Sequence, residues 1–408
     1  MLSRCQSKHL DAPDAAVSPD AAESPDASDG PDASVSPEAI TAERVLELAG
    51  EQLQRTVAQT QPTDYPQSTK PDGTWKTVPN TALIAWTQGF FPGCLWYLFQ
   101  ASGDVTYKTA AALWTGNLEL QKTNRQTHDL GPKLFYSFGN GYRATGDTAY
   151  ESVLLVGAES LASRFRPKVG VLSAADWNPD WKLPLVVDTM ISLELLMWAA
   201  EHGGRPALRD IAISQARVTA RELVRENGGT FQIVDFNPDT GSVRFKGTYQ
   251  GYAADSTWSR GQAWAIYGFT MMYRYTHDPD MLKSARKVTE YYLARLPPDG
   301  VPNWDFDDPK QLKDSSTAAV VTSALLELST LETDASNATR YRQAALHMFE
   351  SLASPAYLAP SSPAPSTLGL LLHGVGNLPA NQEVDTSLIY GDYFFIEAAW
   401  RVLHGIQR

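Results

Sequence analysis

Six segments of the chain are apolar over nearly their whole length and begin at polar or aromatic residues. They are Trp86–Gln100, His128–Thr145, Val187–Gly203, Arg260–Thr276, Ser315–Ser329 and Gly391–His404. A helix that is apolar on all sides is a buried helix. These segments therefore predict six helices that other parts of the protein enclose.

A second set of segments alternates with the first and has an amphipathic pattern. Thr41–Thr56 precedes the first apolar segment, and five more open at residues 103, 146, 206, 277 and 337, mostly at Gly, Asp or Asn. Asp and Asn are good N-caps, and Gly is a good helix terminator. Six buried and six amphipathic helices predict an all-α protein, an (α/α)6 barrel in which an outer ring covers an inner ring. An open α-solenoid is the alternative, but its inner helices are not usually this aromatic.

Three stretches depart from this alternation. Residues 228–245 alternate apolar and polar positions around an Asn-Pro-Asp-Thr-Gly turn, which predicts a β-hairpin near the mouth of the barrel. Residues 1–37 are mainly Ala, Asp, Ser and Pro and are expected to be a disordered tail, because they cannot bury enough apolar surface. Residues 355–366 are expected to form a surface loop, and residues 38–408 a single catalytic domain.

Composition narrows the class of function. The net charge of −12 argues against a nucleic-acid-binding protein, which needs clustered Lys and Arg. The 11 Trp, 17 Tyr and 14 Phe are more than a core requires, and flat sugar faces are one use for the surplus.

Other chemistry and locations have little support in the sequence. Cys5 and Cys94 cannot form a disulfide framework, and no cysteine spacing suits a metal. No cofactor is expected. No apolar run is long enough to cross a bilayer. Residues 1–20 lack the apolar region of a secretory signal, which predicts a cytoplasmic location. The oligomeric state stays open.

Two aspartates are the candidate reacting groups. The inner helices of such a barrel run the same way, so their N-termini meet at one mouth. Asp188 follows the apolar run Leu183–Val187, where burial should raise the pKa of its carboxyl. Asp129, beside His128, opens the preceding inner helix. Paired carboxylates in unequal environments suit the acid/base cleavage of a glycosidic bond. An Asp at a helix start is otherwise an N-cap, the reading favoured for Asp314 and Asp392.

The sequence leaves two possible roles open for Arg260 and for each of three tryptophans. An Arg at a helix N-terminus opposes the helix dipole and needs an anion, either an internal Asp or the carboxylate of an acidic sugar. Trp86, Trp177 and Trp264 lie near the predicted mouth, where they either pack or stack on a sugar.

The ordered motifs resemble the unsaturated glucuronyl hydrolases, glycoside hydrolase family 88. They are THDLG (127–131), PLVVDTM (184–190), IVDFNPDTG (233–241), TYQGYAADSTWSRGQAWAIYGF (248–269), DSSTAAV (314–320) and EVDTSLIYGDYFFIEA (383–398). The resemblance extends from about residue 40 to the C-terminus. It implies an (α/α)6 barrel without metal that acts on oligosaccharides bearing an unsaturated uronic acid at the non-reducing end. One Asp would protonate C4 of the C4=C5 bond while water adds at C5.

The resemblance also implies roles for individual residues. Asp188 matches the general acid/base and Asp129 the assisting carboxylate. The candidate substrate-binding residues are Trp86, Phe91, His128, Trp177, Gln232, Tyr249, Arg260, Trp264 and Ser387. Gln232 and Tyr249 stand where His is common in the family, and Phe91 where Trp is expected. These differences leave the reaction class unchanged but put any transfer of substrate preference in doubt.

Three other functions compete with this one. The related unsaturated rhamnogalacturonyl hydrolases share the fold and the hydration chemistry but act on pectin fragments. Sugar 2-epimerases use paired histidines, which the seven His of this chain do not supply in matched motifs. A catalytically inactive sugar-binding protein is the most distant alternative, and the presence of both Asp129 and Asp188 argues against it.

Overall fold

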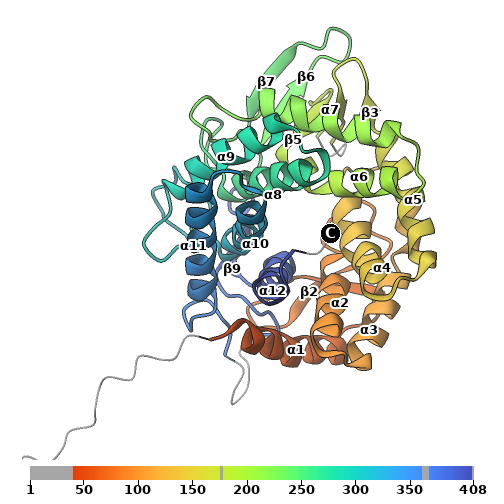
Figure 1. Ribbon diagram of the computed structural model, residues 1–408, viewed down its shortest axis with the longest axis vertical. Helices are drawn as coiled ribbons and strands as arrows, with labels where there is room; N and C mark the ends of the chain where they lie inside the picture. Colours follow the sequence, from red (N-terminus) through yellow and green to blue (C-terminus); the bar gives the residue numbers. More distant parts are fainter. Residues whose placement is uncertain (1–39, 175–177, 361–366, 407–408) are drawn as a thin grey trace, which may run out of the picture. The chain divides into compact units, whose positions relative to one another are not determined.

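The apolar segments form an inner ring of helices in the computed structural model, which describes residues 40–174, 178–360 and 367–406 (Figure 1). Each inner-ring helix contacts the next, and the last contacts the first, so the ring is closed. The inner-ring elements are α2 (Phe90–Ser102), η2 (Gly131–Gly139) with α4 (Asn140–Thr145), η3 (Val187–Ser192) with α6 (Leu193–Glu201), α8 (Ser259–Thr276), α10 (Ser315–Leu331) and α12 (Ile389–His404).

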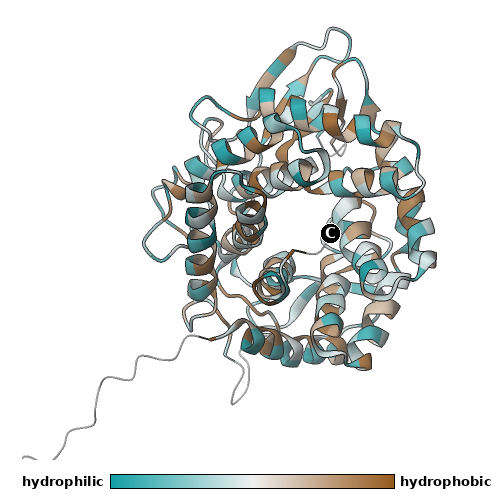
Figure 2. Ribbon diagram, viewed as in Figure 1, coloured by the Kyte–Doolittle hydropathy of each residue, from teal (hydrophilic) through white to brown (hydrophobic). Residues whose placement is uncertain are grey.

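The amphipathic segments form the outer ring. Aspartate side chains cap four of these helices, as at Asp104, whose carboxylate accepts a hydrogen bond from the Thr106 N–H. Figure 2 shows teal, hydrophilic residues recurring along the outer helices. The outer-ring helices are α1 (Ala42–Gln59), α3 (Val105–Gly116), α5 (Thr148–Ala162), α7 (Ala207–Glu222), α9 (Pro279–Leu293) and α11 (Ala335–Leu352). The predicted (α/α)6 barrel is therefore confirmed.

The loops between the helices contain short β-strands. The predicted hairpin is present as β6 (Ile233–Phe236) and β7 (Val243–Gly247), and β5 (Pro184–Val186) pairs with β6 to complete a three-stranded sheet in the order β5-β6-β7. The sequence did not predict β5 or the other three hairpins. These are β1 (Asp64–Thr69) with β2 (Trp75–Pro79), β3 (Phe165–Arg166) with β4 (Val171–Leu172), and β8 (Gly374–Asn377) with β9 (Gln382–Thr386).

The first three inner helices begin differently from the expectation. The first starts at Phe90, so Trp86 lies in the loop before it. The second starts with a π-helix, η2, and the third with a 3-10 helix, η3. Gly89, just before the first of these helices, lies against the start of the second, where a Cβ would stand 2.0 Å from the carbonyl oxygen of Pro132. Irregular helical turns of this kind are frequent at functional sites. Here η3 contains Asp188, and Asp129 lies in the turn just before η2.

Buried ion pairs lie near the end of the barrel where the inner helices finish. Arg143 and Arg274 bind Glu194 at 2.9 and 2.7 Å, and Arg274 and Arg401 bind Glu327 at 3.2 and 3.1 Å. Cations near the C-terminal ends of helices complement the helix dipole. The cleft that contains Asp129 and Asp188 lies at the other end, where the inner helices begin.

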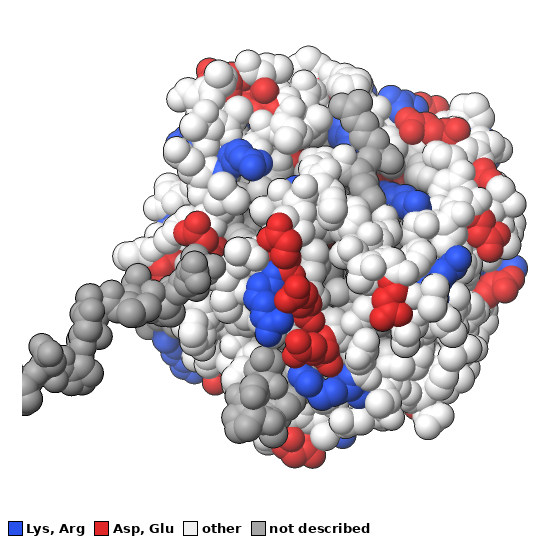
Figure 3. All heavy atoms as spheres, turned by 60° about the horizontal axis from the view of Figure 1, so that its bottom comes forward, with Lys and Arg blue, Asp and Glu red and all other residues white. Residues whose placement is uncertain are grey.

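Residues 39–408 form one compact unit. The predicted disordered tail, residues 1–37, lies outside the described residues, as does part of the predicted loop 355–366. Among the helices of the described part of the chain, none is long and apolar enough to span a membrane. Figure 3 shows one face of the protein, where a row of acidic side chains has basic side chains beside it and wide uncharged areas surround both.

Candidate active site

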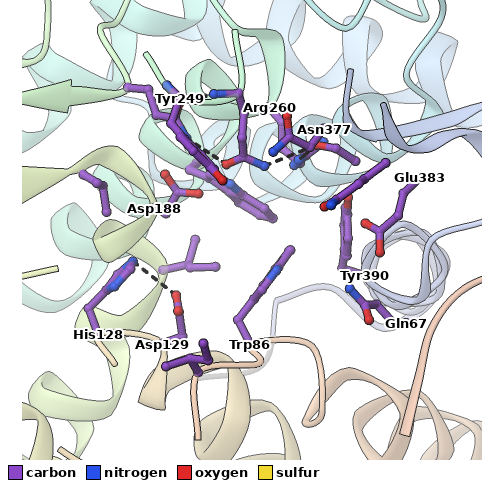
Figure 4. A pocket seen from close by; sticks show the side chains of 18 residues that line it. Gln67, Trp86, His128, Asp129, Asp188, Tyr249, Arg260, Asn377, Glu383 and Tyr390 are labelled. Atoms are coloured by element: carbon purple, nitrogen blue, oxygen red, sulfur yellow. Dashed lines mark hydrogen bonds and ion pairs between the residues drawn. The ribbon is translucent and has the colours of Figure 1, made fainter. Parts of the chain in front are cut away.

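A cleft of about 400 Å³ opens at the N-terminal ends of the inner helices. Eight of the residues predicted from sequence line it: Trp86, His128, Asp129, Asp188, Gln232, Tyr249, Arg260 and Trp264. Figure 4 shows Asp188 and Asp129 on one side of the cleft, with Gln67, Glu383 and Tyr390 on the other. Three acids, an arginine and several aromatic rings therefore share one small space.

Asp188 is held in an apolar setting at the start of η3. Its side chain is partly accessible, while its Oδ2 atom is buried without a hydrogen-bond partner in the described residues. Burial, followed by the negative charge of Asp129, raises the pKa of the Asp188 carboxyl from 3.8 to about 7. Arg260 and a hydrogen bond from Trp264 act in the opposite direction but do not prevail. Asp188 can therefore hold a proton near neutral pH, as the sequence led us to expect.

Asp129 lies in a polar setting at the turn before η2. Its Oδ2 accepts a hydrogen bond of 2.7 Å from the Thr127 hydroxyl, and its Oδ1 lies 3.3 Å from Nε2 of His128. Burial is the main cause that lowers the pKa of His128. The neighbouring imidazole is thus kept neutral, and the two cleft aspartates have the unequal environments that acid/base chemistry requires.

A buried lysine, Lys133, lies one helical turn after Asp129. The Lys133 ammonium donates hydrogen bonds of 3.2 and 2.7 Å to the carbonyls of Ala82 and Leu83, in the loop that carries Trp86. Burial lowers the pKa of Lys133 to about 7, and the charge of Asp129 opposes that change. Lys133 thus ties the loop of Trp86 to the helix of Asp129.

Arg260 is engaged by the protein itself. Its Nη1 atom lies 3.3 Å from Oδ2 of Asp314 and also donates to the Val375 carbonyl, and its Nη2 atom donates to the Gly376 carbonyl at 2.5 Å. Asp314 additionally caps α10 through the Ser316 N–H. The sequence left two anions open as partners of Arg260, an internal Asp or the carboxylate of a sugar. In the structure an internal Asp, Asp314, is the partner. Arg260 therefore anchors β8 to the cleft floor while one edge still lines the cleft.

Gln232 organises the loop that carries Tyr249. Its Oε1 atom accepts hydrogen bonds of 2.7–2.8 Å from the Thr248 hydroxyl and from the backbone N–H groups of Tyr249 and Gln250. Its Nε2 atom donates to Oε1 of Gln250 at 2.8 Å. Gln232 therefore shapes the wall of the cleft through its side-chain amide.

Aromatic rings form another wall. The Trp86 ring lies 4.7 Å from that of Tyr390 and 6.2 Å from that of Trp264, measured between ring centroids. Trp264 and Tyr390 are almost fully buried, whereas Trp86 is half-buried in its loop. Of the three, Trp86 offers the most ring surface to a bound sugar.

Comparison with known proteins identifies the family. The family model described as Glycosyl Hydrolase Family 88 matches residues 53–354. The chain belongs to glycoside hydrolase family 88. The family 88 chain is also 41% identical over 323 residues to the unsaturated glucuronyl hydrolase of Formosa agariphila, an alignment that covers 78% of this chain and 79% of the relative.

Solved structures agree with this assignment. An unsaturated glucuronyl hydrolase specific for heparin superposes with a TM-score of 0.84 at 35% identity, covering 90% of this chain and 98% of that one. A variant of the Streptococcus agalactiae enzyme complexed with dGlcA-GalNAc6S superposes with a TM-score of 0.75 at 28% identity, covering 91% and 94%. The family 88 resemblance expected from the motifs is thus confirmed, and with it the class of enzyme, a glycoside hydrolase.

Three of the predicted site residues do not line the family 88 cleft. Phe91 is fully buried and packs 5.4 Å from the Trp114 ring, because α2 starts at Phe90 and turns this side chain towards α3. Ser387 is buried behind β9 and lines a neighbouring cavity with Thr69. Trp177 lies outside the described residues.

Several cleft residues escaped the sequence reasoning. They are Gln67, Ile84, Val186, Ile191, Gln250, Gly376, Asn377, Gln382, Glu383 and Tyr390. Four of them stand inside motifs quoted above and could have been included on that ground: Val186, Gln250, Glu383 and Tyr390. The residues of β1 and of the β8–β9 hairpin left no periodic signal. Within the described ranges, no group of three or more His, Cys, Asp or Glu side chains could hold a metal ion.

Proposed function

We propose that this protein hydrates the C4=C5 double bond of an unsaturated glucuronic acid at the non-reducing end of oligosaccharides that polysaccharide lyases release. The observation that carries the proposal is the partly buried Asp188 carboxyl, with a pKa of about 7, beside Asp129 in one cleft. Family 88 membership and the names of the relatives support the substrate class.

In this proposal Asp188 donates the first proton. The double bond is an enol ether, so a proton that adds to C4 leaves positive charge shared between C5 and the ring oxygen. A carboxylic acid can do this near neutral pH only if its environment keeps it protonated, and burial does so for Asp188. The Trp264 indole, which donates a hydrogen bond to Asp188, orients the carboxyl.

Water then attacks C5 and completes the hydration. The proton that water loses passes to a carboxylate, either Asp188, which has just been deprotonated, or Asp129. The C5 hemiketal opens as its bond to the ring oxygen breaks, which leaves a ketone at C5 and a hemiacetal at C1. The hemiacetal expels the rest of the oligosaccharide as an alcohol. Glycosidic cleavage therefore follows from hydration and needs no nucleophilic attack at C1.

Asp129 has a supporting role in this proposal. The hydrogen bond that it accepts from the Thr127 hydroxyl and its contact with His128 fix the carboxylate close to Asp188. From there its negative charge raises the pKa of Asp188 before the reaction and faces the positive charge that develops at C5. Removal of Asp129 should therefore slow the reaction and lower the pKa of Asp188.

The substrates that we propose are fragments of glycosaminoglycans. One structural relative is described as specific for heparin, and another binds dGlcA-GalNAc6S. Unsaturated galacturonyl and rhamnogalacturonyl fragments carry the same double bond and therefore belong in the same assay as competing substrates.

The decisive assay follows the ultraviolet absorbance of the C4=C5 bond. We expect the absorbance of an unsaturated glucuronyl disaccharide to disappear with the wild-type protein and to persist with Asp188→Asn. Asp210→Asn, at an exposed position of α7, is the matched control and should keep the wild-type rate. Persistence of the absorbance with glucuronyl, galacturonyl and rhamnogalacturonyl substrates would overturn the proposed function. Full activity of Asp188→Asn would overturn the role of Asp188 alone.

A further inference from the structure

A strip of aromatic side chains leads out of the cleft over the β5-β6-β7 sheet. Tyr249 lines the cleft, and its ring lies 6.3 Å from that of Trp181, in the segment before β5. The Trp181 ring in turn lies 6.3 Å from that of Phe245 in β7. We call Tyr249, Trp181 and Phe245 the aromatic strip. It continues the wall of the active site outwards.

The strip is held in place from behind. Oδ1 of the buried Asp235 accepts hydrogen bonds of 2.9 and 2.8 Å from the backbone N–H groups of Lys182 and Leu183, directly after Trp181. Arg244 of β7 binds Oδ2 of Asp235 and donates to the Asp180 carbonyl, directly before Trp181. Trp181 also packs on a small apolar cluster of Ala174, Val186 and Ile233. Since its backbone is fixed on both sides, Trp181 would lose little freedom when it binds a ligand.

Two side chains of the strip are exposed to water, which is unfavourable for aromatic rings unless a ligand covers them. Tyr249 is 49% exposed and Phe245 is 38% exposed. Neighbouring exposed apolar side chains mark binding sites more often than isolated ones do. β7 is the edge strand of its sheet, but it carries Arg244 and Lys246 beside Phe245, and such charges oppose pairing with another strand. A ligand that stacks on rings suits this surface better than a second protein chain does.

We propose that the aromatic strip binds the pyranose rings of the oligosaccharide that lie beyond the two nearest the reacting bond. The inference rests on the proposed function, because it places the unsaturated sugar at Asp188 and leads the remaining chain out past Tyr249. Each sugar ring has an apolar face that can stack on an aromatic ring. The strip therefore makes the protein prefer an unsaturated tetrasaccharide to an unsaturated disaccharide.

The test compares the two chain lengths in the absorbance assay. We expect the wild-type kcat/KM for the tetrasaccharide to exceed that for the disaccharide, and Phe245→Ser and Trp181→Ala to reduce this advantage by about three- to tenfold each, mainly through KM. The disaccharide kinetics of Phe245→Ser should stay unchanged. Leu113→Ala, at a 49% exposed position of the outer helix α3, is the control and should retain the full advantage.

The outcomes separate this inference from the proposed function. If the disaccharide is hydrated but the wild type shows no preference for the tetrasaccharide, the strip is not a sugar site although the function holds. The same conclusion follows if Phe245→Ser keeps the wild-type preference, or if it turns a dimeric wild type into a monomer with unchanged preference. Because Trp181→Ala also disturbs the cluster beneath it, Phe245→Ser decides the matter. If neither substrate is hydrated, the proposed function fails.

Discussion

Replacement of Asp188 by Asn should stabilise the protein at alkaline pH although it removes activity. The ionised Asp188 carboxylate is unfavourable in the fold, since burial and the charge of Asp129 raise its pKa from 3.8 to about 7. The folded state therefore binds more protons than the unfolded state between these pH values, and the stability of the wild type falls as the pH rises through this window. Asn has nearly the same shape and no charge to lose.

The size of the effect follows from the pKa difference. At about 1.36 kcal/mol per pKa unit, the change from 3.8 to about 7 corresponds to at most about 4 kcal/mol above pH 7. With an unfolding entropy of about 2.1 cal/mol/K per residue over residues 39–408, this amounts to an increase in Tm of about 5 °C at pH 8. Below about pH 4 the carboxyl is protonated in both states, so the increase should vanish there.

Thermal unfolding of the wild type and Asp188→Asn across pH 4 to 8 is the assay. Asp314→Asn is the matched control, because Asp314 is a buried carboxylate that lies 3.3 Å from Arg260 of the cleft. Loss of this partner leaves the guanidinium uncompensated, so the control should be destabilised, by about 3–5 kcal/mol. If Asp188→Asn has the same Tm as the wild type at pH 8, or a lower one, Asp188 does not carry a raised pKa and the reasoning is refuted.

Three further predictions concern the rate and the walls of the cleft. First, kcat/KM should fall about tenfold per pH unit above about pH 7, because Asp188 must be protonated to react; a flat pH profile between 6 and 9 would contradict this. Second, Arg260→Lys should lose the links to the Val375 and Gly376 carbonyls and cost about 1.5–3 kcal/mol in denaturant unfolding, with a higher KM; unchanged kinetics and stability would show that Arg260 does not anchor β8. Third, Gln232→Leu leaves three hydrogen-bond donors of residues 248–250 without their acceptor and should raise KM at least as much as Tyr249→Ala does; a wild-type KM would exclude the positioning role.

The helical ring was predictable because its signal is periodic and long. Apolar segments of 15 or so residues specify buried helices whatever their exact ends are. The raised pKa of Asp188 was equally predictable, since the apolar run that precedes it forms β5 and the start of η3 in the structure. The ordered sequence motifs then identified glycoside hydrolase family 88.

The walls of the cleft were not predictable in the same way. Glu383 lies in a short strand at φ 56°, a left-handed conformation that no propensity favours for Glu. Gln232 and Arg260 were predicted as site residues, but their partners lie in other segments of the chain. Gln232 binds Gln250. Arg260 binds Asp314, Val375 and Gly376. Such contacts depend on how distant loops meet, which local patterns do not specify.

The isotope effect of deuterium at C4 of the substrate tests the central claim most directly. We compare initial rates for an unsaturated glucuronyl disaccharide with hydrogen and with deuterium at C4. If Asp188 protonates C4 in the slow step, C4 changes from trigonal to tetrahedral, and the deuterated substrate should react faster. Equal rates, with release of the second sugar while the C4=C5 absorbance persists, would contradict hydration and point to direct cleavage at C1.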